Sequence, residues 1–236
     1  MSIFTIGKYN IDVDSAMSNV PQIPDVEFSL EMPPVETGGC SVLMIGSTRS
    51  GKSTALKWIM DSYFKKHCGC LFSQSAKANA YKDMNYPLIV KSAAYVPELI
   101  HDMYLINKDT KNHYPFLVVI DDCPLIRADK ELIKLATIYR NSGLSSIVCA
   151  QNLQMLNPTC RSNINFILLF QLNNTEAMER TIKTFLRGYL PQGWNYDQKI
   201  AWYKSQTADH HFLFIDNLHG TIYRSKIDVS KGGSSK

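Results

Sequence analysis

The feature that most constrains the fold of this chain is the octapeptide Gly46-Ser-Thr-Arg-Ser-Gly-Lys-Ser53, which matches G-x-x-x-x-G-K-[ST] at every fixed position. An apolar run, Val42–Ile45, precedes it, and a run with helical spacing, Thr54–Met60, follows it. Glycines let the backbone curl so that successive amide hydrogens point inward, and the following helix directs its positive end at the same charge. The sequence therefore predicts a phosphate-binding loop whose nucleotide contacts are Gly46, Ser47, Thr48, Arg49, Ser50, Gly51, Lys52, Ser53 and Thr54.

Side chains of this loop and of a second motif predict a site for ATP and Mg²⁺. Lys52 supplies a mobile cation for the β- and γ-phosphates, and Ser53 offers a hydroxyl to magnesium. The apolar run Phe116–Ile120 ends in Asp121 and Asp122, and P-loop proteins present an acid to magnesium at such a strand end. We expect Asp121 on the metal side and Asp122 orienting or deprotonating a water. The alternative for Asp122 is that it caps the next segment.

Two further groups complete the predicted site. The apolar run Ser146–Ala150 ends in Gln151, and where a strand is inserted between the two half-sites its tip carries a polar sensor, which fits Gln151. A positioned arginine accelerates phosphoryl transfer by about 10³–10⁵. Arg140 and Arg161 are the candidates, supplied to a neighbouring subunit, with Arg49 in the loop as a third. The alternative for each is a solvated surface arginine.

The order of patterns along the chain predicts the α/β class, with a mostly parallel central sheet covered by helices on both faces. We expect residues 1–40 to form an extension packed on the core, 41–229 to form one domain, and 230–236 to be a flexible tail. Short pieces at Phe4–Ile6 and Val26–Leu30 read as edge strands. The expected strands of the core are 41–45, 70–73, 116–120, 146–150, 164–170, 212–216 and 221–224, and the expected helices are 52–66, 94–106, 130–140 and 176–186.

Composition excludes several classes of protein. Hydrophobic residues make up 45% of the chain and charged residues 19%, which is typical of a globular protein. No apolar run approaches the roughly 20 residues of a membrane-spanning helix, and the first residues do not resemble a secretory signal. A net charge of +4 permits contact with nucleic acid without requiring it.

The six cysteines have no disulfide-framework spacing. Cys68 and Cys70, beside His67, could join Cys40 in a metal site, but no second close pair of ligands completes it. Free thiols in a reducing compartment are the favoured interpretation.

The motifs, taken in order, resemble those of the FtsK–HerA superfamily of ATP-driven DNA pumps. The likeness is closest to the genome-packaging ATPases of poxviruses, other large DNA viruses and virophages, and covers roughly residues 40–225. The order that carries it is the loop, the strand with Asp121 and Asp122, Tyr139-Arg-Asn141 before the strand that ends in Gln151, and Pro158-Thr-Cys-Arg-Ser-Asn163. Two positions depart from many relatives, which have Glu at 122 and His at 141.

The resemblance implies a RecA-like P-loop ATPase that forms a ring, as a hexamer, around double-stranded DNA and drives it into a preformed capsid at a vertex. It implies the site roles given above for Lys52, Ser53, Asp121, Asp122 and Gln151, and trans-acting roles for Arg140 or Arg161. It also implies action in the host cytoplasm, in a viral factory or in the virion, without secretion. DNA contacts would be independent of sequence. Basic candidates for them are Lys65, Lys66, Lys77, Lys82 and Lys91.

Two other functions stay open on the sequence alone. One is a P-loop nucleoside or nucleotide kinase, although Arg180, Lys183 and Arg187 are spaced like a helix face and not like a compact lid. The other is a non-catalytic, nucleotide-gated assembly protein such as a capsid scaffold.

Overall fold

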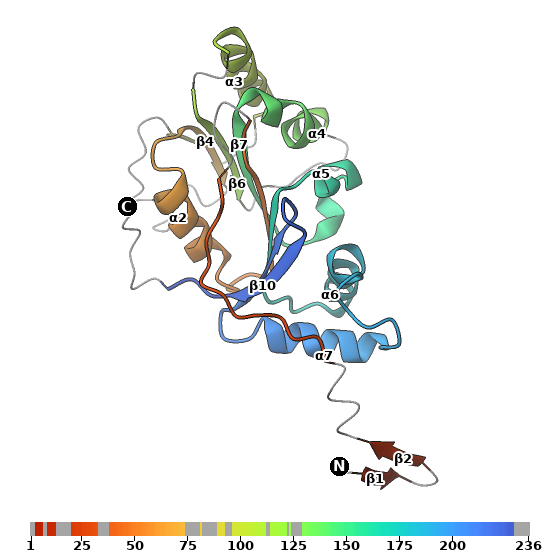
Figure 1. Ribbon diagram of the computed structural model, residues 1–236. Helices are drawn as coiled ribbons and strands as arrows, with labels where there is room; N and C mark the ends of the chain where they lie inside the picture. The colour runs from red at the N-terminus through yellow and green to blue at the C-terminus, as the bar shows by residue number, and fades with distance from the viewer. Residues whose placement is uncertain are drawn as a thin grey trace.

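The computed structural model of the chain describes residues 3–6, 9–12, 20–32, 38–73, 81, 89–92, 96–111, 114–121, 123 and 129–228 (Figure 1). Asp122 and the predicted tail 230–236 lie outside these residues. The strands are β1 Ile3–Ile6, β2 Tyr9–Asp12, β3 Ser41–Ile45, β4 Cys68–Ser73, β5 Ile89–Ser92, β6 Phe116–Asp121, β7 Leu144–Ala150, β8 Phe166–Leu169, β9 Phe212–Asp216 and β10 Thr221–Ser225. The α-helices are α2 Lys52–Tyr63, α3 Pro97–Asp109, α4 Lys130–Thr137, α5 Pro158–Ser162, α6 Thr175–Thr181 and α7 Tyr196–Gln206.

One eight-stranded sheet, in the order β10-β9-β8-β3-β7-β6-β4-β5, forms the centre of the molecule. Its strands pair in parallel from β5 to β8, whereas β9 is antiparallel to both of its neighbours. Strand β7 lies between β3, which leads into the loop, and β6, which carries Asp121. The predicted α/β class, the mostly parallel sheet and the strand inserted between the two half-sites are confirmed.

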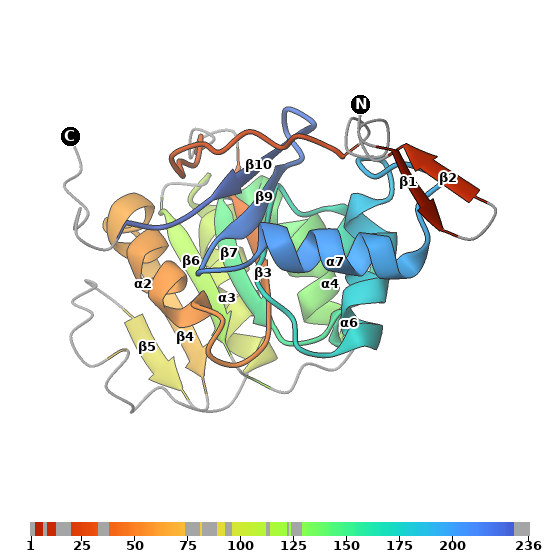
Figure 2. The same ribbon diagram turned by 90° about the horizontal axis from the view of Figure 1, so that it is seen from below.

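The parallel pairing gives the sheet two chemically different edges. We call the edge where β3, β6 and β7 end the carboxyl edge, and the edge where they begin the amino edge. Ile45 is paired with Ala150, and Asp121 with Cys149, so these strands end nearly level. Figure 2 shows the connection from β3 to α2 at the edge toward which β4 and β5 point. The topology thus brings the loop and Asp121 to the same edge.

Successive side chains of the sheet point to opposite faces and pack into two separate hydrophobic cores. On one face, Leu56, Ile59 and Met60 of α2 pack on the sheet together with Phe28 and Leu30. On the other face, the sheet is covered by buried residues of α3, α4, α6 and α7 (Figures 1 and 2). Every residue of β3, β7, β8 and β9 is buried, as expected for strands covered on both sides.

The first part of the chain differs from expectation. Strand β1 forms as predicted, but it pairs with β2 in a separate two-stranded sheet. The predicted strand at Val26–Leu30 is wrong, because only a single bridge, between Asp25 and Arg224, joins this stretch to β10. The segment 20–32 contacts the core instead through Phe28. Its ring meets those of Phe212 and Phe214 edge-on, with ring centroids 5.2 and 5.1 Å apart.

Most other differences between the predicted and the observed elements lie at the ends of helices. The predicted helix 130–140 ends at Thr137 and continues as a 3₁₀ turn, Tyr139–Ser142, closed by Gly143 with φ 77°. The predicted helix 176–186 is α-helical only to Thr181 and becomes a π-helix over Ile182–Leu186. Strands β2 and β5 and helices α5 and α7 were not predicted. Among the described residues, no helix is both long enough and apolar enough to cross a bilayer.

Candidate nucleotide site

The loop Gly46–Ser53 needs glycine at both fixed positions, for two different reasons. Gly51 adopts φ 100°, ψ 0° at the N-cap of α2, a left-handed conformation that side chains disfavour. At Gly46 the limit is space, because a Cβ there would lie 2.6 Å from Cβ of Phe170 and 2.7 Å from Oγ of Ser50. Arg49 also has positive φ, 63°. The backbone therefore curls tightly, as a phosphate cradle requires.

Lys52 places its charge inside this curl. Its Nζ donates to the carbonyl oxygens of Gly46 at 2.5 Å and Ser47 at 2.8 Å. Neither an acidic residue in the first turn of α2 nor a capping side chain from the described residues neutralises the start of the helix. The amide groups at this end of α2 and the ammonium group together favour a bound anion.

The other loop residues fall into two groups. Ser47 ties the loop to the segment after β8, because its amide donates to the Gln171 carbonyl at 2.9 Å and its Oγ accepts from the Asn173 amide at 2.8 Å. Ser50 is buried, and its Oγ has no hydrogen-bond partner among the described residues. The exposed residues of the loop and of the first turn of α2 are Thr48, Arg49, Ser53 and Thr54.

Asp121 ends β6 with only 4% of its surface exposed. It accepts a hydrogen bond from the hydroxyl of Tyr81, which is itself buried. Burial and then the charge and hydrogen bond of Asp121 raise the pKa of Tyr81 above its ordinary value. A buried hydroxyl therefore holds the carboxylate of Asp121, one of the two predicted magnesium ligands.

Gln151 directly follows β7 at the carboxyl edge and is exposed. It lines a cavity of about 400 Å³ with Ser47 and Thr48 of the loop. The rest of the lining comes from Asn152 and from the segment after β8: Asn173, Asn174, Glu176, Ala177 and Arg180. The predicted sensor thus faces the same space as the loop, whereas Asp122, the predicted partner for water, lies outside the described residues.

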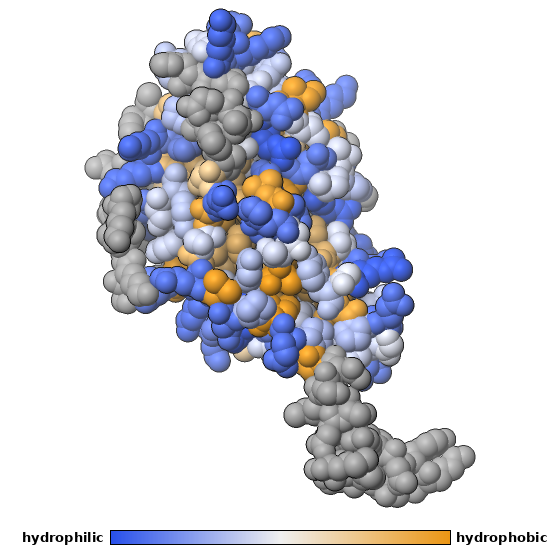
Figure 3. All heavy atoms as spheres, in the orientation of Figure 1, coloured by the Kyte–Doolittle hydropathy of each residue, from blue (hydrophilic) through white to orange (hydrophobic). Residues whose placement is uncertain are grey.

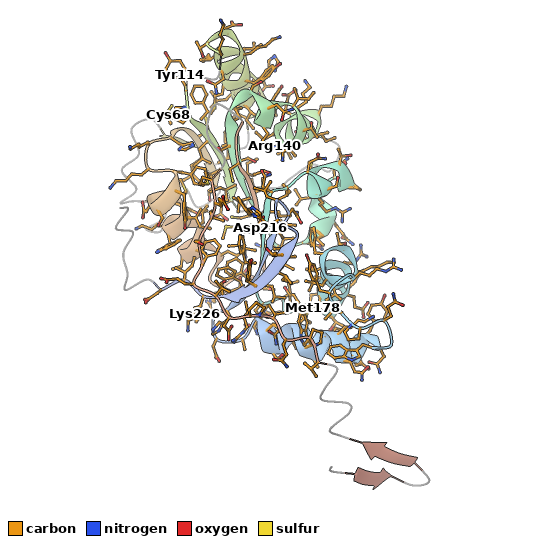
Figure 4. All side chains as sticks on the ribbon, viewed as in Figure 1. Cys68, Tyr114, Arg140, Met178, Asp216 and Lys226 are labelled. Carbon is orange, nitrogen blue, oxygen red and sulfur yellow. The ribbon has the colours of Figure 1, made fainter. Side chains whose placement is uncertain are left out.

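The two candidate arginines lie at the other edge. Arg140 sits in the 3₁₀ turn just before β7 and donates from Nη1 to the Asn163 carbonyl at 2.9 Å. Arg161 lies in α5, which leads to Asn163 and the start of β8. In Figure 4 the labelled Arg140 belongs to this edge, as does Asp216, which pairs with the first residue of β8. The structure thus places Arg140 against the residue that follows α5, which carries Arg161, at the edge opposite the loop.

Sequence reasoning missed Tyr81 and the polar segment after β8. Tyr81 stands in no periodic pattern, and only its side chain contacts reveal it. Asn174 could have been found from the sequence, since an Asn before a helical run is a typical N-cap. In the structure its side chain accepts a hydrogen bond from the Ala177 amide. Arg180 was considered only as part of a kinase lid.

The cysteines form no metal site in the described part of the chain, where no cluster of three His, Cys, Asp or Glu residues could hold an ion. All six are free thiols. Burial is the main cause that raises the pKa of Cys70 to about 11 and the pKa of Cys40 to about 12.

Solved structures with a similar fold include a genome packaging NTPase, B204 of Sulfolobus turreted icosahedral virus 2, in complex with ATP-gammaS. Its TM-score is 0.57 at 15% identity, over 80% of this chain and 97% of that one. The conjugation coupling protein TcpA of pCW3 has a TM-score of 0.55 at 13% identity, over 83% of this chain and 62% of that one. At these identities the likeness shows the P-loop ATPase-like fold.

Curated relatives are viral proteins. Uncharacterized protein 015R of Frog virus 3 (isolate Goorha) is 29% identical over 64% of this chain, which spans about half, 49%, of that protein's length. Uncharacterized protein 075L of Invertebrate iridescent virus 6 is 24% identical over a stretch that covers 76% of this chain and 71% of that protein. The family model "Poxvirus A32 protein" matches residues 37–186, which include the loop, Asp121 and Gln151. The chain therefore belongs to the Poxvirus A32 protein family, and the predicted relationship with poxvirus-type packaging ATPases is confirmed.

Proposed function

We propose that this chain is an ATPase that drives double-stranded viral DNA into a preformed capsid. One observation carries the proposal. The cradle with Lys52 and the buried acid Asp121 lie at the same edge of a sheet, on two strands separated by β7. The family and the likeness to a genome packaging NTPase support DNA packaging as the use of this site.

Each group has a distinct role in splitting ATP. The loop amides and Lys52 hold the β- and γ-phosphates. Asp122 orients the attacking water, and Gln151, facing the same cavity as Ser47, holds that water or contacts the γ-phosphate. Because this cavity is lined by loop residues on one side, water placed beside Gln151 lies next to the phosphate cradle.

Ser53 and Asp121 fit the metal that such a nucleotide carries. Both offer oxygen ligands, which Mg²⁺ prefers. Ser53 belongs to the first turn of α2, directly after the loop, and Asp121 ends β6, so both lie at the carboxyl edge. Bound there with ATP, Mg²⁺ would neutralise charge on the phosphates.

The position of the arginines supports a ring. Strand β7 has seven residues, which at about 3.3 Å each separate its two ends by roughly 20 Å. Arg140 precedes this strand and Gln151 follows it, so Arg140 is too far away to reach the nucleotide of its own chain. If Arg140 or Arg161 stabilises the transition state, a neighbouring copy must supply it. This supports a ring of copies, for which we keep the hexamer that the family resemblance implies.

A basic pocket supports an anionic partner. It has a volume of about 380 Å³ and is lined by Lys183, Arg187 and Lys199, with Tyr196, Ile182 and Leu190. None of the three cations forms an ion pair with a carboxylate of the described residues. Like charges that converge without counter-ions repel one another, and a phosphate backbone would relieve this. We assign the pocket to DNA phosphates, whose binding is independent of sequence.

The capsid vertex is the second partner in this proposal, and we place the activity in the host cytoplasm, in a viral factory or in the virion. The ATPase rate of the chain, measured against increasing duplex DNA with Lys52→Ala as control, tests the function. Stimulation is expected because a translocase couples hydrolysis to DNA. A flat response would contradict translocation, and a phosphorylated nucleoside product would favour a kinase instead.

A further inference from the structure

The turn between α7 and β9 holds two residues in a backbone conformation that few side chains adopt. The φ angles are 54° at Asp209 and 62° at His210, and the His211 amide donates to the Ala208 carbonyl at 3.0 Å. A four-residue turn closed in this way, with positive φ at both central positions, corresponds to type I′, in which glycine and asparagine dominate. Histidine at the second central position therefore keeps backbone strain that glycine would relieve.

Both ends of this turn are fixed in the core. Thr207, just before it, is 1% exposed and donates from Oγ1 to the Tyr203 carbonyl at 2.9 Å. Phe212, just after it, is also 1% exposed and begins β9. Strained conformations cluster at ligand sites and persist only where the surrounding structure enforces them. The buried residues on both sides of the turn therefore hold His210 in one place.

His210 lies beside the nucleotide loop. Strand β9 is antiparallel to β8, so it begins at the carboxyl edge, and the turn before it stands at the same edge as the loop. A Cβ at Gly51 would lie 3.8 Å from Nδ1 of His210. His210 is exposed, and no hydrogen bond or ion pair among the described residues engages its ring. The imidazole is therefore next to the N-cap of α2 and accessible to a ligand.

The order of the strands determines which end of a nucleotide His210 would meet. Asp121 ends β6 and Gln151 follows β7, so the groups proposed to serve the metal and the attacking water lie on one side of β3. The turn lies on the other side of β3, beyond β8. A γ-phosphate directed at Asp121 and Gln151 leaves the ribose and the base on the side of β8 and β9. His210 therefore stands at the base and not at the reacting phosphate.

We propose that His210 is a nucleotide-binding residue whose imidazole stacks on the base of the bound ATP. The inference rests on the proposed function, since it assumes that a triphosphate occupies the loop. A flat aromatic ring stacks on a base without reading its edges, so the contact adds affinity for a nucleoside triphosphate beyond that of its phosphates alone. Glycine at this position would remove the strain but would offer no ring to the base.

Replacing His210 by asparagine tests this contact. Asparagine accepts the left-handed conformation, so His210→Asn keeps the turn and removes only the ring. We expect the affinity for a non-hydrolysable ATP analogue with Mg²⁺ to fall about tenfold, which lies within the range that base–aromatic stacking contributes. The affinity for inorganic tripolyphosphate with Mg²⁺ should not change, because this ligand has no base. Isothermal titration calorimetry measures both affinities and needs no turnover.

Asp209→Asn is the matched control, because it alters the other left-handed residue of the same turn. It should keep the wild-type ratio of the affinities for the analogue and for tripolyphosphate. An equal loss of affinity for both ligands in His210→Asn would overturn base stacking in favour of a phosphate contact, and unchanged affinity for both would overturn any role of His210 in binding. Absence of analogue binding in the wild type and in both variants would overturn the proposed function as well.

A second measurement uses the unaltered chain. On irradiation, 8-azido-ATP attaches through its base to neighbouring residues, and mass spectrometry of the digested chain identifies the labelled peptide. We expect the label on the peptide that contains His210, and its loss when the ATP analogue is present in excess. A label found only on other peptides would overturn the proposal, whatever the affinities of the variant.

Discussion

The two edges of the central sheet differ in what their polar side chains contact. At the carboxyl edge, Lys52 donates into the loop, and Ser47 and Thr48 of that loop line a cavity together with Gln151. At the amino edge, Arg140 donates to a backbone carbonyl, and its own carbonyl accepts the amides of Gly39 and Gly143. The view toward this edge shows hydrophilic side chains around small groups of apolar ones (Figure 3). The polar groups of the carboxyl edge therefore line a cavity beside the loop, whereas Arg140 at the amino edge is engaged in bonds to the backbone.

The strongest test of the carboxyl edge is Lys52→Ala. Removing the ammonium takes away the only loop side chain predicted to reach the β- and γ-phosphates, and we expect turnover of ATP to fall about 10³-fold, as for loss of a major transition-state donor. Phosphate release measures it. Lys204→Ala, at an exposed lysine of α7, should keep the wild-type rate.

The amino edge is tested by Arg140→Ala. If Arg140 acts in trans, turnover should fall at least about 10²-fold, since positioned arginines contribute about 10³–10⁵. Mixing this variant with Lys52→Ala should restore part of the activity, because some interfaces then combine an intact loop with an intact arginine. A mixture as inactive as its components would remove the distinction between the two edges, and Arg161→Ala tested in the same way would show which arginine acts.

The basic pocket belongs to neither set of catalytic groups. Replacing Lys183, Arg187 and Lys199 together by alanine should weaken binding of duplex DNA about 10-fold or more and reduce the salt dependence of log K by about 2–3, which is roughly 0.9 for each lost phosphate contact. ATP turnover without DNA should not change. Loss of turnover without DNA would show that the pocket serves the nucleotide site.

The sequence predicts those parts of the fold and the site whose residues lie close together in the chain. The loop, its strand and helix, and the acid after β6 are contiguous patterns, and parallel strands necessarily bring their ends to one edge. Tyr81 has no such signal, since its hydrogen-bond partner, Asp121, is 40 residues away in the chain. Helix α7 was missed because its apolar signal is short: its buried residues, Ile200, Trp202 and Tyr203, span a single turn. Asn195 and Gln198 nevertheless form a capping box that could have revealed its start.

The smallest expected effect concerns stability at the amino edge. His67, just before β4, is 9% exposed, packs against Phe64 at 4.9 Å, and has no described hydrogen-bond partner for Nδ1. Burial lowers its pKa from 6.5 to about 4. As pH falls from about 6.5 to about 4, the unfolded chain takes up a proton at His67 that the folded chain does not, so folding loses stability over this interval.

Replacing this histidine by an apolar residue removes the proton uptake. We expect the loss of unfolding free energy between pH 7 and pH 4 to be smaller by about 1–2 kcal/mol in His67→Leu, as measured by urea denaturation. His210→Leu, at an exposed position beside the loop, is the control and should follow the wild-type pH dependence. If instead both variants lose stability in parallel with the wild type, the acid sensitivity lies elsewhere, and the amino edge contributes to stability only through its backbone bonds and packing.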